Sequence, residues 1–297
     1  MNPDLRLMNI SPIDARTFYL RATSRAYNEA GADLTIMLRS VDGQWGQYNI
    51  DAPVVSHCAF EADGRNVFSL TPFGILHVAR SSGFFWEKLD ADTETSPNRL
   101  RHMRALVRAG QDVIAVGMAR MAYRRLSNGR WERIDQSMRS RTPNCGLLAV
   151  DGCDESHIVA VGFGGEAWRF DGKVWSQLAI PTNVKLEQVR VVAPGKMAVC
   201  GVGGAMFTGQ EDAWTPLALT SSRLTLWGLA YFEGRFYAAD SSQIYVQDGD
   251  KLQPVKLPFS HQVTTGRLQA CDGRLWSVGE SDLLVYDGSQ WATVPCP

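Results

Sequence analysis

The chain has 297 residues, of which 45% are hydrophobic and 21% charged, and its formal net charge is -1. This composition is that of a globular protein with a substantial core, and it excludes a disordered or strongly charged chain. No apolar run approaches membrane-spanning length, and the opening residues MNPDLRLMNISPID lack the basic and apolar segments of a secretory signal, so we expect a cytoplasmic protein that does not contact a membrane.

One sequence unit recurs seven times along the chain. Each unit has an alternating apolar run, a turn, a second alternating run, a tight turn such as Asp-Gly, and then a large apolar residue. The units reach this residue at Trp45, Trp86, Trp131, Trp175, Trp214, Leu252 and Trp291, with spacings of 41, 45, 44, 39, 38 and 39 residues. A period near forty with several short strands per unit is typical of a β-propeller blade.

The units predict an all-β fold, a single seven-bladed β-propeller with four antiparallel strands (A to D) in each blade. In chain order we place the blades at about 4–52, 53–91, 102–136, 145–181, 186–220, 224–258 and 264–297. Strand D begins at the tryptophan, whose ring fills space between neighbouring sheets. Asp-Gly before it tolerates the positive φ angles of a tight hairpin.

Three blades depart from this pattern. Blade 1 has an insertion between strands B and C (TSRAYNEAGAD), blade 2 has Ser-Gly in place of Asp-Gly, and blade 6 lacks the tryptophan. The first blade begins with a strand A of its own (RLMNIS) and the last ends with a strand D of its own (WATV). We therefore expect the ring to close by packing of blades 1 and 7, without a strand shared between the two ends.

Two glycine runs resemble a phosphate-binding loop. They comprise Gly162, Gly164 and Gly165, and then Gly201, Gly203 and Gly204 one unit later. A nucleotide-binding glycine run leads into a helix, whereas each of these runs leads into another strand. We interpret both as turns between strands B and C.

The blade pattern aVG..G.i.rydG..W resembles that of bacterial β-propeller repeat proteins, related in style to kelch and Asp-box propellers. The resemblance covers nearly the whole chain and is clearest in blades 3 to 5 and 7. It implies that the B–C turns and D–A connections gather on one face around a central channel, where partners bind. The stretch SVDGQW at 40–45 is too short for a true Asp box, so no sialidase residues are carried over.

Arginine is concentrated in one segment of the chain. Between Arg99 and Arg141 there are eleven arginines, no lysine and three acids. Arginine is favoured where planar, bidentate contacts to carboxylate or phosphate are made. The candidate partner-binding residues on the loop face are Arg99, Arg101, Arg120, Met121, Arg139, Arg141, Phe163, Glu166, Asp240 and Glu280.

The sequence contains no recognisable catalytic motif, and we predict no catalytic residue, no cofactor and no metal. The six cysteines form no C-x-x-C pair and the five histidines have no ligand spacing. On strand A of blade 2, His57 either faces the channel or lies hydrogen-bonded in the core.

Three functions remain to be compared. The first is a non-catalytic module that binds another protein, for example a cytoplasmic inhibitor or immunity protein that covers a toxin's active site. The alternative is a carbohydrate-active or lyase-type enzyme whose carboxylates Glu166, Asp240 and Glu280 meet in the central channel. Nucleic-acid binding is disfavoured, because the residues outside the arginine segment are acidic overall.

Overall fold

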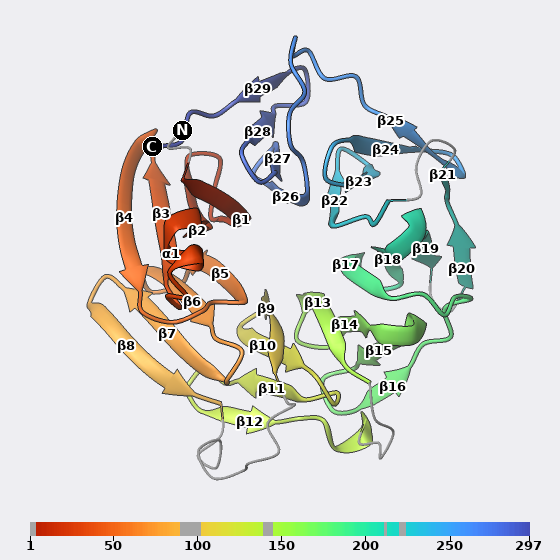
Figure 1. Cartoon of the computed structure of the whole chain (residues 1–297). Helices are drawn as coiled ribbons and strands as arrows, with labels where there is room; N and C mark the ends of the chain where they lie inside the picture. The colour runs from red at the N-terminus through yellow and green to blue at the C-terminus, as the bar shows by residue number, and fades with distance from the viewer. Residues whose placement is uncertain (1–3, 90–101, 139–144, 211–212, 220–223) are drawn as a thin grey trace.

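The computed structural model describes residues 4–89, 102–138, 145–210, 213–219 and 224–297. Its strands form seven antiparallel sheets that follow one another around a central axis, so the predicted seven-bladed β-propeller is confirmed (Figure 1). Each sheet contains four consecutive strands, and the sixth gains the short β21, which pairs in parallel with β25. Within the described ranges, no helix has the length and apolar character needed to cross a membrane.

The strands of the first four blades have the following bounds. Blade 1 consists of β1 (Leu5–Pro12), β2 (Thr17–Ser24), β3 (Thr35–Val41) and β4 (Gln44–Ile50). Blade 2 consists of β5 (Ser56–Glu61), β6 (Arg65–Leu70), β7 (Ile75–Arg80) and β8 (Gly83–Lys88). Blade 3 consists of β9 (Met103–Ala109), β10 (Asp112–Gly117), β11 (Ala122–Arg125) and β12 (Trp131–Arg133). Blade 4 consists of β13 (Leu147–Asp154), β14 (His157–Gly162), β15 (Ala167–Phe170) and β16 (Trp175–Gln177).

The remaining blades and the short helices complete the fold. Blade 5 consists of β17 (Leu186–Ala193), β18 (Lys196–Gly201), β19 (Met206–Gln210) and β20 (Ala213–Pro216). Blade 6 consists of β22 (Gly228–Phe232), β23 (Arg235–Ala239), β24 (Ile244–Asp248) and β25 (Lys251–Pro254), joined by β21 (Ala218–Leu219). Blade 7 consists of β26 (Arg267–Cys271), β27 (Arg274–Val278), β28 (Leu283–Tyr286) and β29 (Trp291–Thr293). The described helices are α1 (Arg25–Glu29), η2 (Gln136–Met138), η3 (Phe163–Gly165) and η4 (Val202–Gly204).

The hydrophobic core is a series of layers between neighbouring blades. Every residue of β10 is buried, because both faces of this strand pack against other sheets. One such layer joins Ile114 and Val116 of blade 3 to Leu147 and Ile158 of blade 4. The strands that line these layers are therefore apolar on both faces, which accounts for the continuous apolar runs in the sequence.

The turns follow the interpretation made from the sequence. Asp42 and Gly43 have φ angles of 49° and 77° between β3 and β4, as expected for the Asp-Gly hairpin. Gly164 and Gly165 have φ angles of 64° and 75° in η3, and the chain continues into strand β15. The glycine runs are thus B–C turns, and no helix follows them to present its N-terminus to a phosphate.

The expected role of the tryptophan is wrong in blade 2. Trp175 and Trp291 each pair with the last residue of strand C and are buried. In blade 2, strand D already begins at Gly83, so Trp86 pairs with His77, three residues before the end of strand C. This displacement leaves the Trp86 ring 57% exposed on the outer strand.

The ring closes by packing of its first and last blades, without a described strand shared between them. The described strands of these blades form two separate sheets, β1–β4 and β26–β29. One apolar cluster includes Phe18 and Leu20 of blade 1 together with Trp276 and Val278 of blade 7. The rings of Phe18 and Trp276 lie 4.7 Å apart, so the expectation of closure without a shared strand is confirmed.

Candidate functional site

The B–C turns and D–A connections lie on one face, here called the loop face, because strand A runs in the same direction in every blade. Backbone hydrogen bonds connect this face from blade to blade. The amide of Ala119 donates to the carbonyl of Cys145 (3.0 Å), and that of Thr265 donates to Ser241 (3.1 Å). The amide of Leu7 donates to Glu280 (2.9 Å) across the closure of the ring. The loop face is therefore a rigid, preorganised surface.

Arg120 and Glu166 come together between blades 3 and 4. Arg120 lies in the B–C turn of blade 3, and its guanidinium pairs with the Glu166 carboxylate, which also accepts a hydrogen bond from Trp168 Nε1 (2.7 Å). The guanidinium lies 5.4 Å from the Trp168 ring. These contacts fix the orientation of Arg120, and they occupy the carboxylate of Glu166 inside the protein.

A hollow of about 340 Å³ adjoins this ion pair. Half-buried Phe163 lines it together with Arg120 and Thr182, and the Lys185 ammonium lies 6.0 Å from the Phe163 ring. The hollow therefore combines an aromatic ring with an arginine, which are the side-chain types enriched at the centres of protein interfaces.

The other predicted partner-binding residues are scattered or buried. Met121 is buried, and so is Asp240, whose carboxylate accepts hydrogen bonds from the amides of Ser242 and Gln243 and from Tyr245. Glu280 is exposed and pairs with Arg6 at 3.0 Å. Four of the predicted arginines, Arg99, Arg101, Arg139 and Arg141, lie outside the described residues.

Sequence reasoning missed an exposed aromatic ring on the loop face. Phe73 is 53% exposed at the tip of the B–C turn of blade 2 and contacts the ring of His102 at 5.6 Å. The turn is held by Gly74, at φ 77°, and the carbonyl of Pro72 accepts a hydrogen bond from Met103 of the next blade (2.9 Å). The phenylalanine between proline and glycine could have indicated this exposed ring from the sequence, because turns ordinarily carry polar residues.

A second group of aromatic rings lies on the outer strand of blade 2. Phe84 and Phe85 in β8 are 61% and 44% exposed. Phe84 contacts Tyr48 of blade 1, and both line a groove of about 570 Å³ between the two blades. These aromatic side chains lie at the outer edge of the propeller, away from the B–C turns.

The central channel contains a cavity of about 160 Å³ with a mainly polar lining. Four arginines and one acid, Asp151, are among the residues that line it. His57 also lines the channel, and its Nε2 lies 3.3 Å from the carbonyl oxygen of Tyr19, whereas its Nδ1 has no hydrogen-bond partner among the described residues. Burial and the nearby Arg21 lower the pKa of His57 to about 3, so the ring is neutral at pH 7. Glu166, Asp240 and Glu280 do not line this cavity.

One small group of metal-ligating side chains was not predicted. Atoms of Cys153, Asp154 and His157 that are suited to a metal lie within 4.8 Å of one another on the β13–β14 hairpin. His157 Nδ1 lies 2.8 Å from the Asp154 carboxylate, and this hydrogen bond within the turn explains their closeness.

Comparisons with known proteins identify relatives at the level of sequence and of fold. No protein-family model matches the chain. The Immune protein Tsi7 of Pseudomonas aeruginosa PAO1 is 31% identical over 216 residues, which cover 72% of this chain and 71% of that protein.

Two solved structures share the fold at much lower sequence identity. The WD40 β-propeller domain of Doa1 has a TM-score of 0.70 at 10% identity, with 95% of this chain and 92% of that chain covered. YCF48 from Cyanidioschyzon merolae has a TM-score of 0.67 at 14% identity, with 96% of both chains covered. These two likenesses extend to the architecture alone.

Proposed function

Because the chain belongs to the family of the Immune protein Tsi7, we propose that it is an immunity protein, which binds a toxin protein and blocks its action. The observation that carries this proposal is the 31% identity over 72% of the chain, combined with a fold that suits protein binding. A propeller offers a broad rigid surface built from many short loops, and partner recognition is set by the side chains of those loops.

The loop face is the surface that we propose for toxin binding. Its turns are held by hydrogen bonds between blades, so little conformational entropy is lost when a partner docks. Phe73 is exposed there, and Arg120 and Phe163 border the hollow between blades 3 and 4. Aromatic and arginine side chains of this kind dominate the binding energy of most protein interfaces.

The charge pattern supports fast association with an acidic partner surface. The segment from Arg99 to Arg141 has an excess of arginines over acids, although the whole chain has a net charge of -1. Opposed charges on two proteins raise the association rate, and salt weakens this effect. We therefore expect the association rate to fall as ionic strength rises, more than the dissociation rate changes.

We further propose that the protein acts in the cytoplasm. Its six cysteines are free thiols, and burial raises the pKa of Cys58 to about 12, which keeps that thiol unreactive. Cell fractionation of the native host tests this location, and recovery of the chain in a secreted or periplasmic fraction would contradict it.

Co-expression with its toxin tests the proposed function. The toxin to test is the product of any toxin-like reading frame that neighbours the gene of this chain in its native genome. Cells that express this toxin alone should stop growing, cells that also express this chain should grow, and the two purified proteins should form a stoichiometric complex. A folded chain that neither binds the toxin nor restores growth would overturn the proposal.

A pair of phenylalanine substitutions tests the proposed surface. Phe73→Ala removes an exposed ring from the loop face, so it should weaken toxin binding by about tenfold or more without loss of stability. Phe85→Ala, which removes an exposed ring from the outer strand, is the matched control and should bind as the wild type does. Weakened binding by Phe85→Ala alone would place the toxin on the outer strand of blade 2 and refute the loop-face assignment.

A further inference from the structure

The central channel concentrates positive charge in a chain whose net charge is -1. Arg21 of β2, Arg104 of β9, Arg190 of β17 and Arg267 of β26 all line the cavity, and they come from blades 1, 3, 5 and 7. Among the described lining residues Asp151 is the single acid, so this lining carries an excess of three positive charges. Removing a guanidinium group from bulk water costs free energy unless the group gains hydrogen-bond or ion-pair partners.

The described part of the protein supplies hydrogen-bond partners for only some of the N–H groups of these arginines. Arg21 donates from Nη1 to the carbonyl of Val54, and its Nε has no hydrogen-bond partner among the described residues. Arg267 donates from Nη1 to the carbonyl of Trp227 (2.8 Å). Arg104 is the most exposed of the four and forms no ion pair with a described residue. A guanidinium has five N–H donors, so most of the donors of these three side chains have no hydrogen-bond partner among the described residues.

Among the described residues, Arg190 is the one channel arginine that forms an ion pair with a carboxylate. It contacts Asp151 at 3.4 Å and donates to Gln269 Oε1 at 2.7 Å, and its Nε is without a partner in the described part of the chain. Asp151 also accepts a hydrogen bond from the amide of Val191 (2.7 Å). Its carboxylate is therefore committed to blades 4 and 5 and does not neutralise the arginines of blades 1, 3 and 7.

The pKa shifts of the channel side chains agree with an excess of positive charge in the lining. Burial and the neighbouring Arg267 lower the pKa of Arg21 to about 10, because each disfavours the charged guanidinium. Glu187 attracts Arg267, but it also pairs with Lys185 at 2.6 Å, so its charge is shared. His57 is neutral and adds no charge of either sign to the lining.

We propose that the central channel is a binding site for a small oxyanion, a phosphate or carboxylate group held by Arg21, Arg104 and Arg267. The fork of a guanidinium matches the two oxygens of such a group, and this bidentate hydrogen bonding is stronger than that of neutral donors. The cavity of about 160 Å³ has room for the group with water around it, because one water occupies about 30 Å³ in the liquid. This site is separate from the loop-face residues proposed for toxin binding.

Titration of the isolated, full-length protein with inorganic phosphate tests the proposal. Phosphate should bind saturably by calorimetry and should raise the melting temperature by about 4 °C at a hundred times its dissociation constant, relative to chloride of equal ionic strength. Acetate should bind at the same site and compete with phosphate. No saturable binding of phosphate or acetate to the folded wild type would overturn the proposal, whatever the variants do.

Two arginine variants locate the site. Arg104→Gln should weaken phosphate binding about tenfold or more, because one charge-assisted hydrogen-bonding group is lost while the fold loses no internal ion pair. Arg16→Gln is the matched control, since this arginine is exposed outside the channel, and it should bind phosphate as the wild type does. Equal affinities of the wild type and Arg104→Gln would refute the assignment to the channel.

A competition experiment with the toxin identifies the source of the oxyanion in the cell. If a carboxylate of the toxin fills the channel, phosphate should weaken the complex in proportion to its occupancy, and Arg104→Gln should weaken it as well. If a free anion fills the channel, saturating phosphate should leave toxin affinity unchanged. Both results are consistent with an oxyanion site, and the titration without toxin is independent of whether the immunity function is correct.

Discussion

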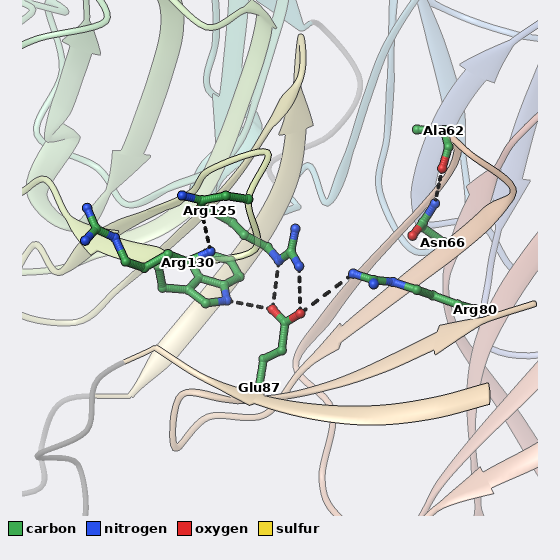
Figure 2. A network of polar contacts seen from close by, with 8 residues as sticks. Ala62, Asn66, Arg80, Glu87, Arg125 and Arg130 are labelled. Carbon is green, nitrogen blue, oxygen red and sulfur yellow. Dashed lines mark hydrogen bonds and ion pairs between the residues drawn. The ribbon is translucent and has the colours of Figure 1, made fainter. Parts of the chain in front are cut away.

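Single side chains hold neighbouring blades together, and Glu87 of β8 shows how. Its carboxylate accepts two hydrogen bonds from Arg125 of blade 3 (both 2.8 Å) and one from Trp131 Nε1 (2.9 Å). Arg80 of its own blade forms a longer ion-pair contact at 3.8 Å, so three side chains converge on one carboxylate (Figure 2). The Arg125 guanidinium also lies 5.0 Å from the ring of Phe68 in blade 2.

Replacing Glu87 by glutamine should destabilise the protein by about 1–3 kcal/mol. The amide keeps the size of the side chain but leaves Arg125, whose side chain is 12% exposed, without a counter-charge. Urea unfolding at pH 7 measures this loss. Glu61→Gln in the same blade is the control and should cost under about 0.5 kcal/mol, because its contact with Arg65 is long (3.9 Å) and exposed. Equal losses in the two variants would contradict the inter-blade role of Glu87.

The buried imidazole of His57 should make stability depend on pH. Its pKa of about 3 in the folded protein lies below the ordinary value of 6.5, so the unfolded chain binds a proton between these values while the folded protein does not. Stability should therefore fall as the pH drops from about 6.5 towards 3, by about 2 kcal/mol between pH 7 and pH 5 from this group alone.

The variant His57→Gln isolates that contribution. Its stability should fall by about 2 kcal/mol less than that of the wild type between pH 7 and pH 5, as measured by urea unfolding at both values. His261→Gln, on an exposed connection, is the control for exchanging a histidine for an amide. The same pH dependence in His57→Gln and the wild type would show that this ring is not kept neutral in the folded protein.

At the scale of strands and turns, the sequence predicted most of the architecture because each blade repeats the same local rules. Alternation located the strands, and Asp-Gly located the hairpins with positive φ. The motif spacing failed at Trp86, because a two-residue turn at Ser81 and Ser82 starts strand D at Gly83, three residues before the tryptophan. Motif spacing alone does not reveal such a shift in register, since the apolar residues that follow remain compatible with a strand.

The two glycines of the turn η3 should tolerate alanine very differently. A Cβ on Gly165 would lie 2.0 Å from the carbonyl oxygen of Thr182 in the connection to blade 5, whereas a Cβ on Gly164 meets no atom within 4 Å. Both residues have positive φ, so both variants bear a backbone cost of about 1 kcal/mol. Gly165→Ala should lose about 2 kcal/mol or more beyond Gly164→Ala in thermal unfolding. Similar losses of stability in the two variants would mean that the connection around Thr182 moves away from the added methyl group at no cost.

At the scale of the whole molecule, the candidate site was harder to predict than the fold. The B–C turns that carry Arg120 and Phe163 followed from the repeat, and the structure places both beside one hollow. Asp240 is buried in a turn in which its carboxylate accepts backbone hydrogen bonds. The amino-acid composition of this turn does not distinguish it from an exposed turn. The channel arginines were not predicted as a group, because Arg21 and Arg267 are 246 residues apart and meet only when the ring closes.

The packed seam between blades 1 and 7 should control the opening of the ring. The Trp276 side chain is 3% exposed there and contacts Phe18, so Trp276→Ala should cost about 3–5 kcal/mol. Because the described strands of these blades share no ladder hydrogen bonds, the loss should appear as local opening, with faster amide hydrogen exchange in β1 and β2 as well as in blade 7.

Phe170→Ala is the control, since it removes an equally buried ring from the layer between blades 3 and 4. It should leave exchange in β1 and β2 slow at a similar loss of stability. If both variants accelerate exchange in every blade alike, the ring opens only by global unfolding and the seam has no special role.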